Sequence, residues 1–146
     1  MRRADLLGAR AGLLLPAAVL VVAVSGLAAG CSSPPPAYCT AATNLNNSVH
    51  NLGNVDVAKD GLGALQTALG KVQSNAKTFV SDAKSAYPSQ TTALQNSLSG
   101  LGTAITSAKG QPPLTAAASV ASSVTNVKNS ADTLQNALKS KCPSGG

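Results

Sequence analysis

Aromatic residues are scarce in this 146-residue chain, which has no Trp, two Tyr and one Phe. Proteins that bind nucleic acid normally cluster Arg and Lys and stack bases on aromatic side chains. Here all three arginines lie within the first ten residues, and the eight lysines are spread over the rest of the chain. The composition therefore argues against a nucleic-acid partner.

Glutamate is absent, and the chain has only five aspartates and one histidine, His50. A glycosidase-type acid and base pair would most naturally use Glu, and a zinc site needs several Cys or His ligands. The sequence contains no P-loop, no dinucleotide fingerprint and no G-x-S-x-G elbow. A Ser-His-Asp arrangement stays open, because its members need not be neighbours in sequence. We predict a protein that is not an enzyme, with no catalytic residues, no metal and no cofactor.

Two carboxylates and the single histidine nevertheless require an interpretation. Asp56 and Asp60 are one helical turn apart, but without a third acidic neighbour they make a poor calcium or magnesium site. Their place at the start of a predicted helix suits capping and the helix dipole. His50 falls beside the apolar positions of its segment, so we expect an ordinary surface residue that points to solvent.

The first 30 residues have the features of an export signal. Arg2, Arg3 and Arg10 give a positive start, and the stretch from Ala11 to Ala29 contains no charged residue. The stretch ends in Leu27-Ala28-Ala29-Gly30-Cys31, which resembles the lipobox of bacterial lipoproteins. This resemblance implies cleavage before Cys31, acylation of Cys31 with palmitate-like chains, and anchoring on the outer face of the cell membrane. Two or more chains make such anchoring stable.

Two alternatives to this reading of the N-terminal segment stay open. The apolar run is marginally long enough to span about 30 Å of hydrocarbon as an uncleaved membrane helix, although the position of Cys31 favours the lipoprotein. Arg2-Arg3 also hints at twin-arginine rather than Sec export. The hint is weak, because Asp5 stands where that signal requires an apolar residue.

The two other cysteines, Cys39 and Cys142, lie near the two ends of the region that follows the signal. Disulfides persist in exported proteins. If Cys31 is acylated, the one pairing left is Cys39–Cys142. A loop of about 100 residues closed in this way contributes up to ~4.7 kcal/mol in the chain-entropy model.

After the signal, apolar residues recur at spacings of three and four, which is typical of helices packed side by side. Nothing shows a sustained period of two, so we expect no strands. The pattern falls into four sets, and the sets are Tyr38, Ala42, Leu45, Val49 and Leu52; Leu62, Leu65, Leu69, Val72, Ala76, Phe79, Ala83 and Ala86; Leu94, Leu98, Leu101, Ile105 and Ala108; and Ala117, Val120, Val124, Val127, Ala131, Leu134 and Leu138.

Helix stop and start signals separate these sets. Gly53 can end the first helix in a left-handed conformation, and Asp56 can cap the second. Pro88 can stop the second helix, with Ser89 as a cap for the third, and residues 110–113 separate the last two. Short connections favour an antiparallel, up-down bundle of four helices with a short first helix. Part of the longer second helix is expected to overhang or bend, and three long helices are the alternative.

We therefore predict a signal peptide at 1–30, a lipidated tether at 31–37, an all-α bundle closed by one disulfide at 38–142, and a disordered tail at 143–146. Three consecutive prolines stiffen the tether. In the up-down topology, Cys39 and Cys142 lie at the same end of the bundle. The core is mostly Ala, Val and Leu, and these small residues leave little room for a large cavity.

The bundle region resembles a group of uncharacterised small secreted or lipid-anchored helical proteins common in actinobacteria. The residues that carry the resemblance are Leu45-Asn46-Asn47-Ser48-Val49, Asn54-Val55-Asp56-Val57 and Gly61-Leu62-Gly63-Ala64-Leu65, framed by Cys39 and Cys142. The resemblance implies an envelope location and a helical fold, and it implies no activity.

From these observations we expect a structural or protein-interaction module. Its partners would be the membrane, through the anchor at Cys31, and an envelope protein or wall polymer. The eight lysines and four aspartates after Cys31 leave a formal charge of +4 for mild attraction to anionic surfaces. The alternative is a carrier of a small apolar ligand or lipid between the helices, including a haem carrier that uses His50 or Tyr87.

Overall fold

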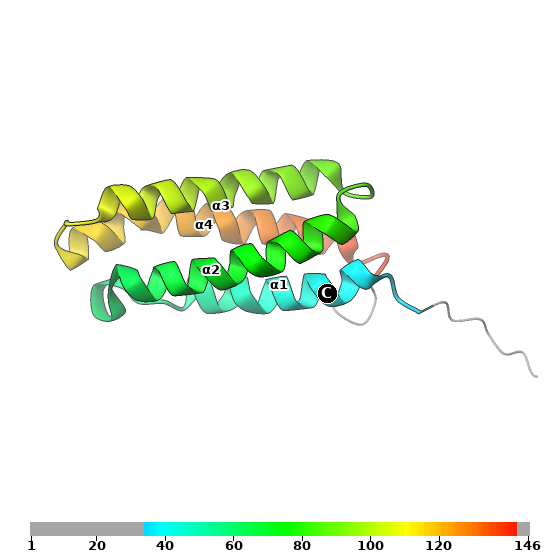
Figure 1. Ribbon diagram of the computed structural model, residues 1–146, viewed down its shortest axis with the longest axis horizontal. Helices are drawn as coiled ribbons and strands as arrows, with labels where there is room; N and C mark the ends of the chain where they lie inside the picture. The colour runs from blue at the N-terminus through cyan, green and yellow to red at the C-terminus, as the bar shows by residue number, and fades with distance from the viewer. Residues whose placement is uncertain (1–33, 143–146) are drawn as a thin grey trace, which may run out of the picture. The chain divides into compact units, whose positions relative to one another are not determined.

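The computed structural model describes residues 34–142, which form an antiparallel bundle of four helices (Figure 1). The helices are α1 (Ala37–Gly53), α2 (Val57–Ala83), α3 (Pro88–Ala108) and α4 (Pro113–Leu138). Helices α1 and α3 each pack against both α2 and α4, and α2 also touches α4 across the bundle. The prediction of an all-α, up-down bundle with a short first helix is confirmed.

The core of the bundle is one cluster of apolar side chains drawn from all four helices. Phe79 is fully buried at its centre, among leucines, valines and alanines. The third predicted set is buried in full, from Leu94 to Ala108. The 3-4 spacing therefore identified the inward faces of the helices, because residues three and four apart share one side of an α-helix.

The first turn of α1 departs from the predicted face. Tyr38 and Ala42 are only partly buried, whereas Cys39 and Ala41 are buried in their place. The disulfide gives the physical reason, because Cys39 must face inward to reach Cys142. At the other end of the second set, Ala86 is exposed in a turn beyond the end of α2.

The connection between α1 and α2 separates two helices, as predicted. Gly53, however, does not end the first helix in a left-handed conformation. The residue after the helix is Asn54, and its backbone lies near the right-handed region at φ −91° and ψ −2°. Positive φ occurs instead at Gly61, with φ 78° and ψ 169°, where α2 bends after its first turn. Glycine is the residue that adopts this conformation at low cost. The expected bend of the long second helix is therefore present, and Gly61 makes it.

The third and fourth helices begin with proline rather than with a polar cap. Ser89 does not cap α3, because Pro88 already occupies the first turn and no side chain caps the helix at Tyr87. Helix α4 begins in the same way, with Pro113 after Pro112. Proline suits this position, since its missing N–H would have no partner in the first turn.

Several predictions fall outside the described residues. The signal peptide, the lipidation site Cys31 and the tail at 143–146 belong to this group, so these assignments stay predictions. Helix α1 begins at Ala37, one residue earlier than the predicted domain boundary. In the part of the chain that the structure describes, no helix is both long enough and apolar enough to span a membrane.

Candidate functional site

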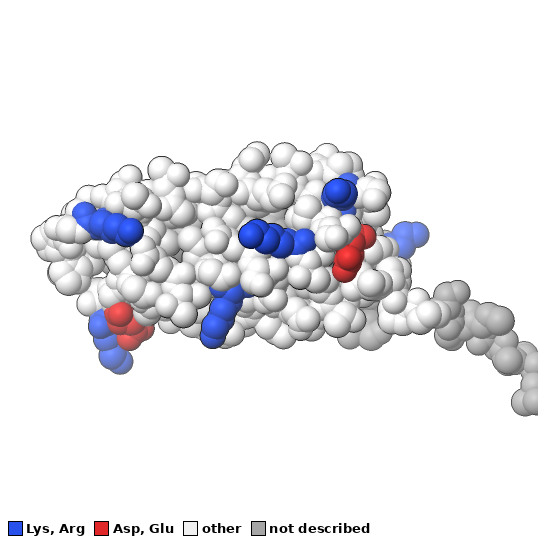
Figure 2. All heavy atoms as spheres, viewed as in Figure 1, with Lys and Arg blue, Asp and Glu red and all other residues white. Residues whose placement is uncertain are grey.

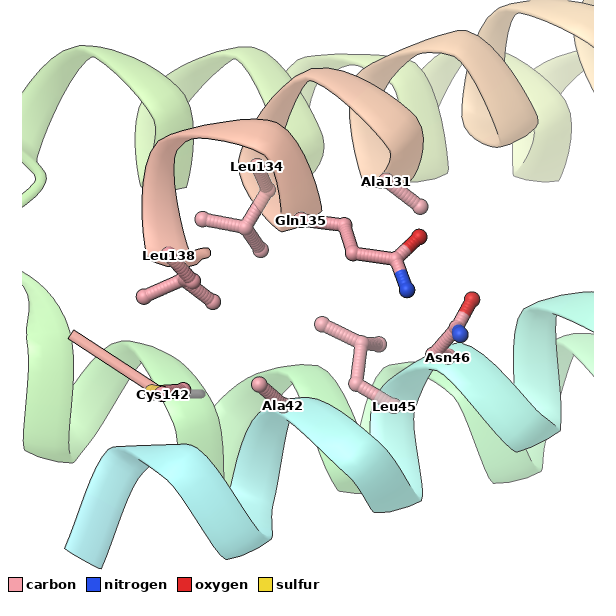
Figure 3. Close-up of a pocket in the computed structure, with 8 residues that line it drawn as sticks. All are labelled: Ala42, Leu45, Asn46, Ala131, Leu134, Gln135, Leu138 and Cys142. Carbon is pink, nitrogen blue, oxygen red and sulfur yellow. The ribbon is translucent and has the colours of Figure 1, made fainter. Parts of the chain in front are cut away.

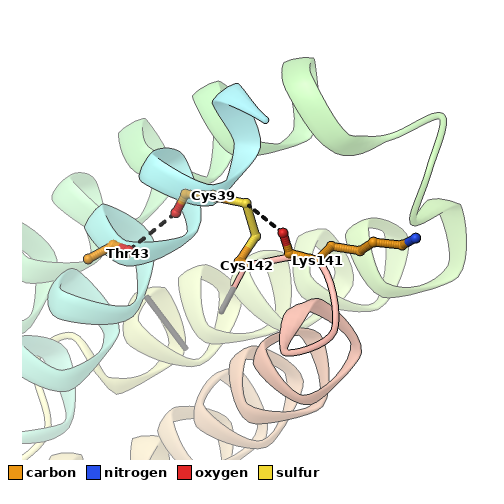
Figure 4. The surroundings of a disulfide bond; sticks show 4 residues. All are labelled: Cys39, Thr43, Lys141 and Cys142. Carbon is orange, nitrogen blue, oxygen red and sulfur yellow. Dashed lines mark hydrogen bonds between the residues drawn. A yellow bond between two sulfur atoms is a disulfide. The ribbon is translucent and has the colours of Figure 1, made fainter. Parts of the chain in front are cut away.

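A disulfide joins Cys39, in the first turn of α1, to Cys142, just after α4 (Figure 4). The two Cα atoms are 5.5 Å apart although 103 positions separate the residues. Both side chains are buried, with 7% and 3% of their surface exposed. The predicted pairing is confirmed, and it closes the end of the bundle at which the described chain begins and ends.

The contacts around this disulfide join parts of the bundle to one another. The Cys39 Sγ lies 3.8 Å from the Lys141 carbonyl oxygen, along the dashed line of Figure 4. A disulfide sulfur carries no hydrogen, so this is a close contact and not a donated hydrogen bond. On the other side, the Thr43 hydroxyl donates to the Cys39 carbonyl over 3.2 Å. Both contacts are within the bundle and involve main-chain carbonyls of the two ends.

The acidic pair at the start of α2 caps that helix. Asp56 Oδ1 accepts hydrogen bonds from the backbone N–H groups of Ala58 and Lys59, at 3.1 and 3.2 Å. Asp60 Oδ2 accepts one from the backbone N–H of Asp56, at 3.2 Å. Both carboxylates therefore satisfy donors that a helix N-terminus leaves unpaired. The predicted capping role of Asp56 and Asp60 is confirmed.

A groove runs between the C-terminal half of α1 and the middle of α4. It measures about 400 Å³. We call it the α1–α4 groove, and its lining residues are Asn46, Val49, His50, Gly53, Asn54, Val124, Thr125, Lys128 and Asp132.

The α1–α4 groove brings a histidine, an aspartate and a hydroxyl to one place without joining them. His50 is exposed, as predicted. The Thr125 hydroxyl donates to the Ala121 carbonyl of its own helix, at 3.0 Å. Within the described chain, no hydrogen bond links His50 to Thr125 or to Asp132. Nor do residues 34–142 contain any group of three or more His, Cys, Asp or Glu side chains placed to hold a metal ion.

A second, much smaller pocket lies between α1 and α4 near the disulfide (Figure 3). Its walls are mainly apolar, with Leu45 facing Leu134 and Leu138, while the amides of Asn46 and Gln135 point toward each other. Its volume is about 20 Å³, close to the space of a single water molecule. A pocket of this size has no room for an acyl chain or a haem.

The two tyrosines pack together at the end of the bundle where α2 turns into α3. The ring centroids of Tyr38 and Tyr87 are 5.6 Å apart and their planes are 78° to each other, an edge-to-face arrangement. Burial first, and then the neighbouring Tyr38 hydroxyl, raise the pKa of Tyr87 above its ordinary value of 10.0. His50 is in the last turn of α1, at the opposite end of the bundle. The two residues considered for haem are therefore not brought together.

On its other flank, α1 forms an open groove with α2 that is lined entirely by polar side chains. The groove measures about 370 Å³. Ser48 lies at its base, where its hydroxyl donates to the Leu45 carbonyl at 2.7 Å. The remaining lining residues, which we call the asparagine face, are Asn44, Asn47, Asn51, Lys71, Ser74 and Asn75.

One hydrogen bond joins the two helices of the asparagine face. Asn75 Nδ2 on α2 donates to the backbone carbonyl of Asn44 on α1, at 3.1 Å. Within residues 34–142, the side-chain amides of Asn44, Asn47 and Asn51 have no hydrogen-bond partner. Asparagine is a poor helix former, and three exposed asparagines in place of alanine cost a helix about 2 kcal/mol.

Sequence reasoning missed the asparagine face, although a signal was present. Asn44, Asn47 and Asn51 follow the same 3-4 spacing as the apolar residues, displaced to an exposed side of the helix. The partner residues on α2 could not be identified in this way, because they depend on how α2 is rotated against α1.

Charge is sparse on the surface of the bundle. Figure 2 shows basic side chains that stand apart from one another, with wide uncharged areas between them on the face in view. Most exposed polar residues of the described chain carry a hydroxyl or an amide. Several hydroxyls donate to carbonyls of their own helix, such as those of Thr67 and Thr103. Leu114, at the start of α4, is the one large hydrophobic residue of the described chain that is strongly exposed.

The chain matches no protein-family model, no curated protein and no solved structure.

Proposed function

We propose that this protein is a lipid-anchored module of the bacterial cell envelope that acts by contact with a partner and not by catalysis. The observation that carries the proposal is the position of α1, which has open polar grooves on both flanks, of about 400 and 370 Å³. Helix α1 is therefore the proposed contact element.

The anchor in this proposal is Cys31, three residues before the first described residue, Pro34. Residues 34–36 precede α1 without helical structure, and Pro36 has the φ −53° and ψ 145° of an extended polyproline conformation. Such a segment acts as a stiff spacer. Anchored in this way, the bundle would be held at its disulfide end, with α1 as the helix nearest to the tether.

The alternative proposal, a carrier of an apolar ligand, is less well supported, because the interior of the bundle has no large apolar cavity among the described residues. Ligand sites usually measure 300 Å³ or more and are mostly apolar. The apolar pocket between α1 and α4 measures about 20 Å³. The two larger grooves beside α1 are open to solvent and are lined mostly by polar residues. An apolar ligand would have to separate helices that are already packed.

In-cell photocrosslinking tests the proposed contact role of α1. A photoreactive amino acid would be placed at Asn47, on α1, and in a matched strain at Asn126, an exposed position of α4 that lines neither groove. We expect a high-mass adduct from position 47 and none from position 126. Equal labelling at both positions, or no adduct from position 47, would contradict the proposal.

A further inference from the structure

The asparagine face has the chemistry of a binding surface whose hydrogen-bonding groups are left available. Its members lie on two adjacent helices that pack through the core and are joined by the bond from Asn75 to the Asn44 carbonyl. Each free amide offers two donors on nitrogen and one oxygen acceptor. Asn44, Asn47 and Asn51 present three such groups in a row along α1. Lys71 adds the one positive charge, and the face contains no acidic residue.

The composition of the face argues against three classes of partner. A peptide or protein partner is normally held by buried apolar or aromatic anchors, and no lining residue of this groove is apolar or aromatic. A lipid surface requires an apolar face or a cluster of basic residues. A nucleic acid requires clustered Lys and Arg, whereas Lys71 is the single cation here.

A glycan remains, and its chemistry matches the face. Sugar hydroxyls donate and accept hydrogen bonds, as the asparagine amides do, and they carry no charge for which the face would need a counterpart. A shallow groove that stays hydrated is suited to such contacts, because bridging waters can complete them. Without aromatic stacking each site would bind weakly, and the repeated units of a polymer would supply the avidity.

We propose that the asparagine face binds a hydroxyl-rich glycan polymer of the envelope, through the amides of Asn44, Asn47 and Asn51 with Lys71 beside them. The inference deepens the proposed function and rests on it for one point, that the bundle is exported to where such a polymer lies. Glycan binding itself does not depend on acylation of Cys31. A failure of the anchor and a failure of the glycan site can therefore be told apart.

Co-sedimentation with insoluble glycans tests the site. The full chain, kept in solution with a mild non-ionic detergent, would be incubated with chitin and with cellulose, two uncharged polymers with and without acetamido groups. We expect binding to at least one of them. The N44A/N47A/N51A triple variant should weaken this binding at least about tenfold, because it removes three amides that hydrogen-bond the polymer.

The matched control is the N126A/N129A/N136A variant, which removes three exposed asparagines from α4 that are not lining residues of the asparagine face or of the α1–α4 groove. We expect it to bind as the unaltered protein does. Both triple variants should melt at or above the temperature of the unaltered protein, since alanine is the better helix former and the Asn75 bond reaches a backbone carbonyl. A lower melting temperature of the α1 variant alone would show a structural role and overturn the inference.

Three other outcomes would also overturn the proposal. The first is binding to neither polymer, and the second is an equal loss of binding in both triple variants. The third is binding that disappears in moderate salt, which would indicate attraction by scattered lysines and not by amides. If the photocrosslink at position 47 then identified a protein, the contact role of α1 would stand and the glycan site would not.

Discussion

Cys39 and Cys142 hold the first turn of α1 against the end of α4, with their Cα atoms 5.5 Å apart. The bond closes a loop that contains nearly the whole bundle. The helices it closes have a core of small and medium-sized side chains. A chain of this length gains only moderate stability from such a core.

Removal of the disulfide should destabilise the bundle strongly. In the chain-entropy model a closed loop of about 100 residues is worth up to ~4.7 kcal/mol. We expect the C39A/C142A variant to lose a large part of this amount in its free energy of unfolding, as measured by urea titration. Reducing agent should shift the unaltered protein to the same midpoint and leave the variant unchanged. Coincident midpoints of variant and oxidised protein would contradict this account.

Gly61 and Gly63 should respond in opposite directions to the same substitution. Gly61 has φ 78° and ψ 169°, a region that other residues enter at a cost of about 1–3 kcal/mol. Gly63 is exposed inside the helix, and a Cβ there would meet nothing within 4 Å. Gly61→Ala should therefore lower the melting temperature. Gly63→Ala should raise it, since alanine in a helix is favoured over glycine by about 1 kcal/mol.

This pair also tests the bend in α2. If Gly61→Ala were stabilising, residue 61 would have to adopt an ordinary helical conformation and α2 would be straight through its first turn. A destabilised Gly63→Ala variant would indicate a close neighbour at that position, contrary to the open space described there.

Asp56 should matter more than an aspartate elsewhere on the same helix. Asp56→Ala removes an N-cap that accepts from Ala58 and Lys59, a change that typically costs about 1 kcal/mol. Asp82, in the last turn of α2, is exposed at the negative end of the helix dipole. Asp82→Ala should therefore be neutral or slightly stabilising. Thermal unfolding of both variants checks the prediction, which fails if the two are equally destabilised.

Tyr87 should make the bundle sensitive to alkaline pH. Its pKa is raised in the folded protein, so the folded state holds the tyrosine proton more tightly than the unfolded state does. The resulting stability is fully present below the ordinary pKa of about 10. It is lost as the pH rises through the folded pKa. Melting temperatures from pH 8 to 11 should fall more steeply for the unaltered protein than for Tyr87→Phe; parallel curves would contradict the prediction.

The buried face of α3 could be predicted from the sequence, because its apolar residues recur with the period of an α-helix. The first turn of α1 could not, since Tyr38 and Cys39 are both apolar enough to face inward. The disulfide decided between them. Four helices could be predicted because Asp56 is a typical N-cap residue and marks the start of a new helix after the break that precedes it.

Backbone conformation at single glycines was less accessible to sequence reasoning. Gly53 and Gly61 lie on either side of the same connection, and both could supply a left-handed residue. The path of the chain between α1 and α2 placed the positive φ at Gly61. The same limit applies to the candidate site. The stripe of Asn44, Asn47 and Asn51 is visible in the sequence, whereas its groove exists only once Lys71, Ser74 and Asn75 pack beside it.

The intact mass of the protein extracted from its native membranes tests whether the bundle is lipid-anchored. We predict a chain that begins at Cys31, carries covalently bound acyl chains at that residue, and retains the disulfide between Cys39 and Cys142. The Cys31→Ala variant should lose both the lipid and the mature mass. A chain that still begins with its signal segment, or one cleaved elsewhere and free of lipid, would contradict the account.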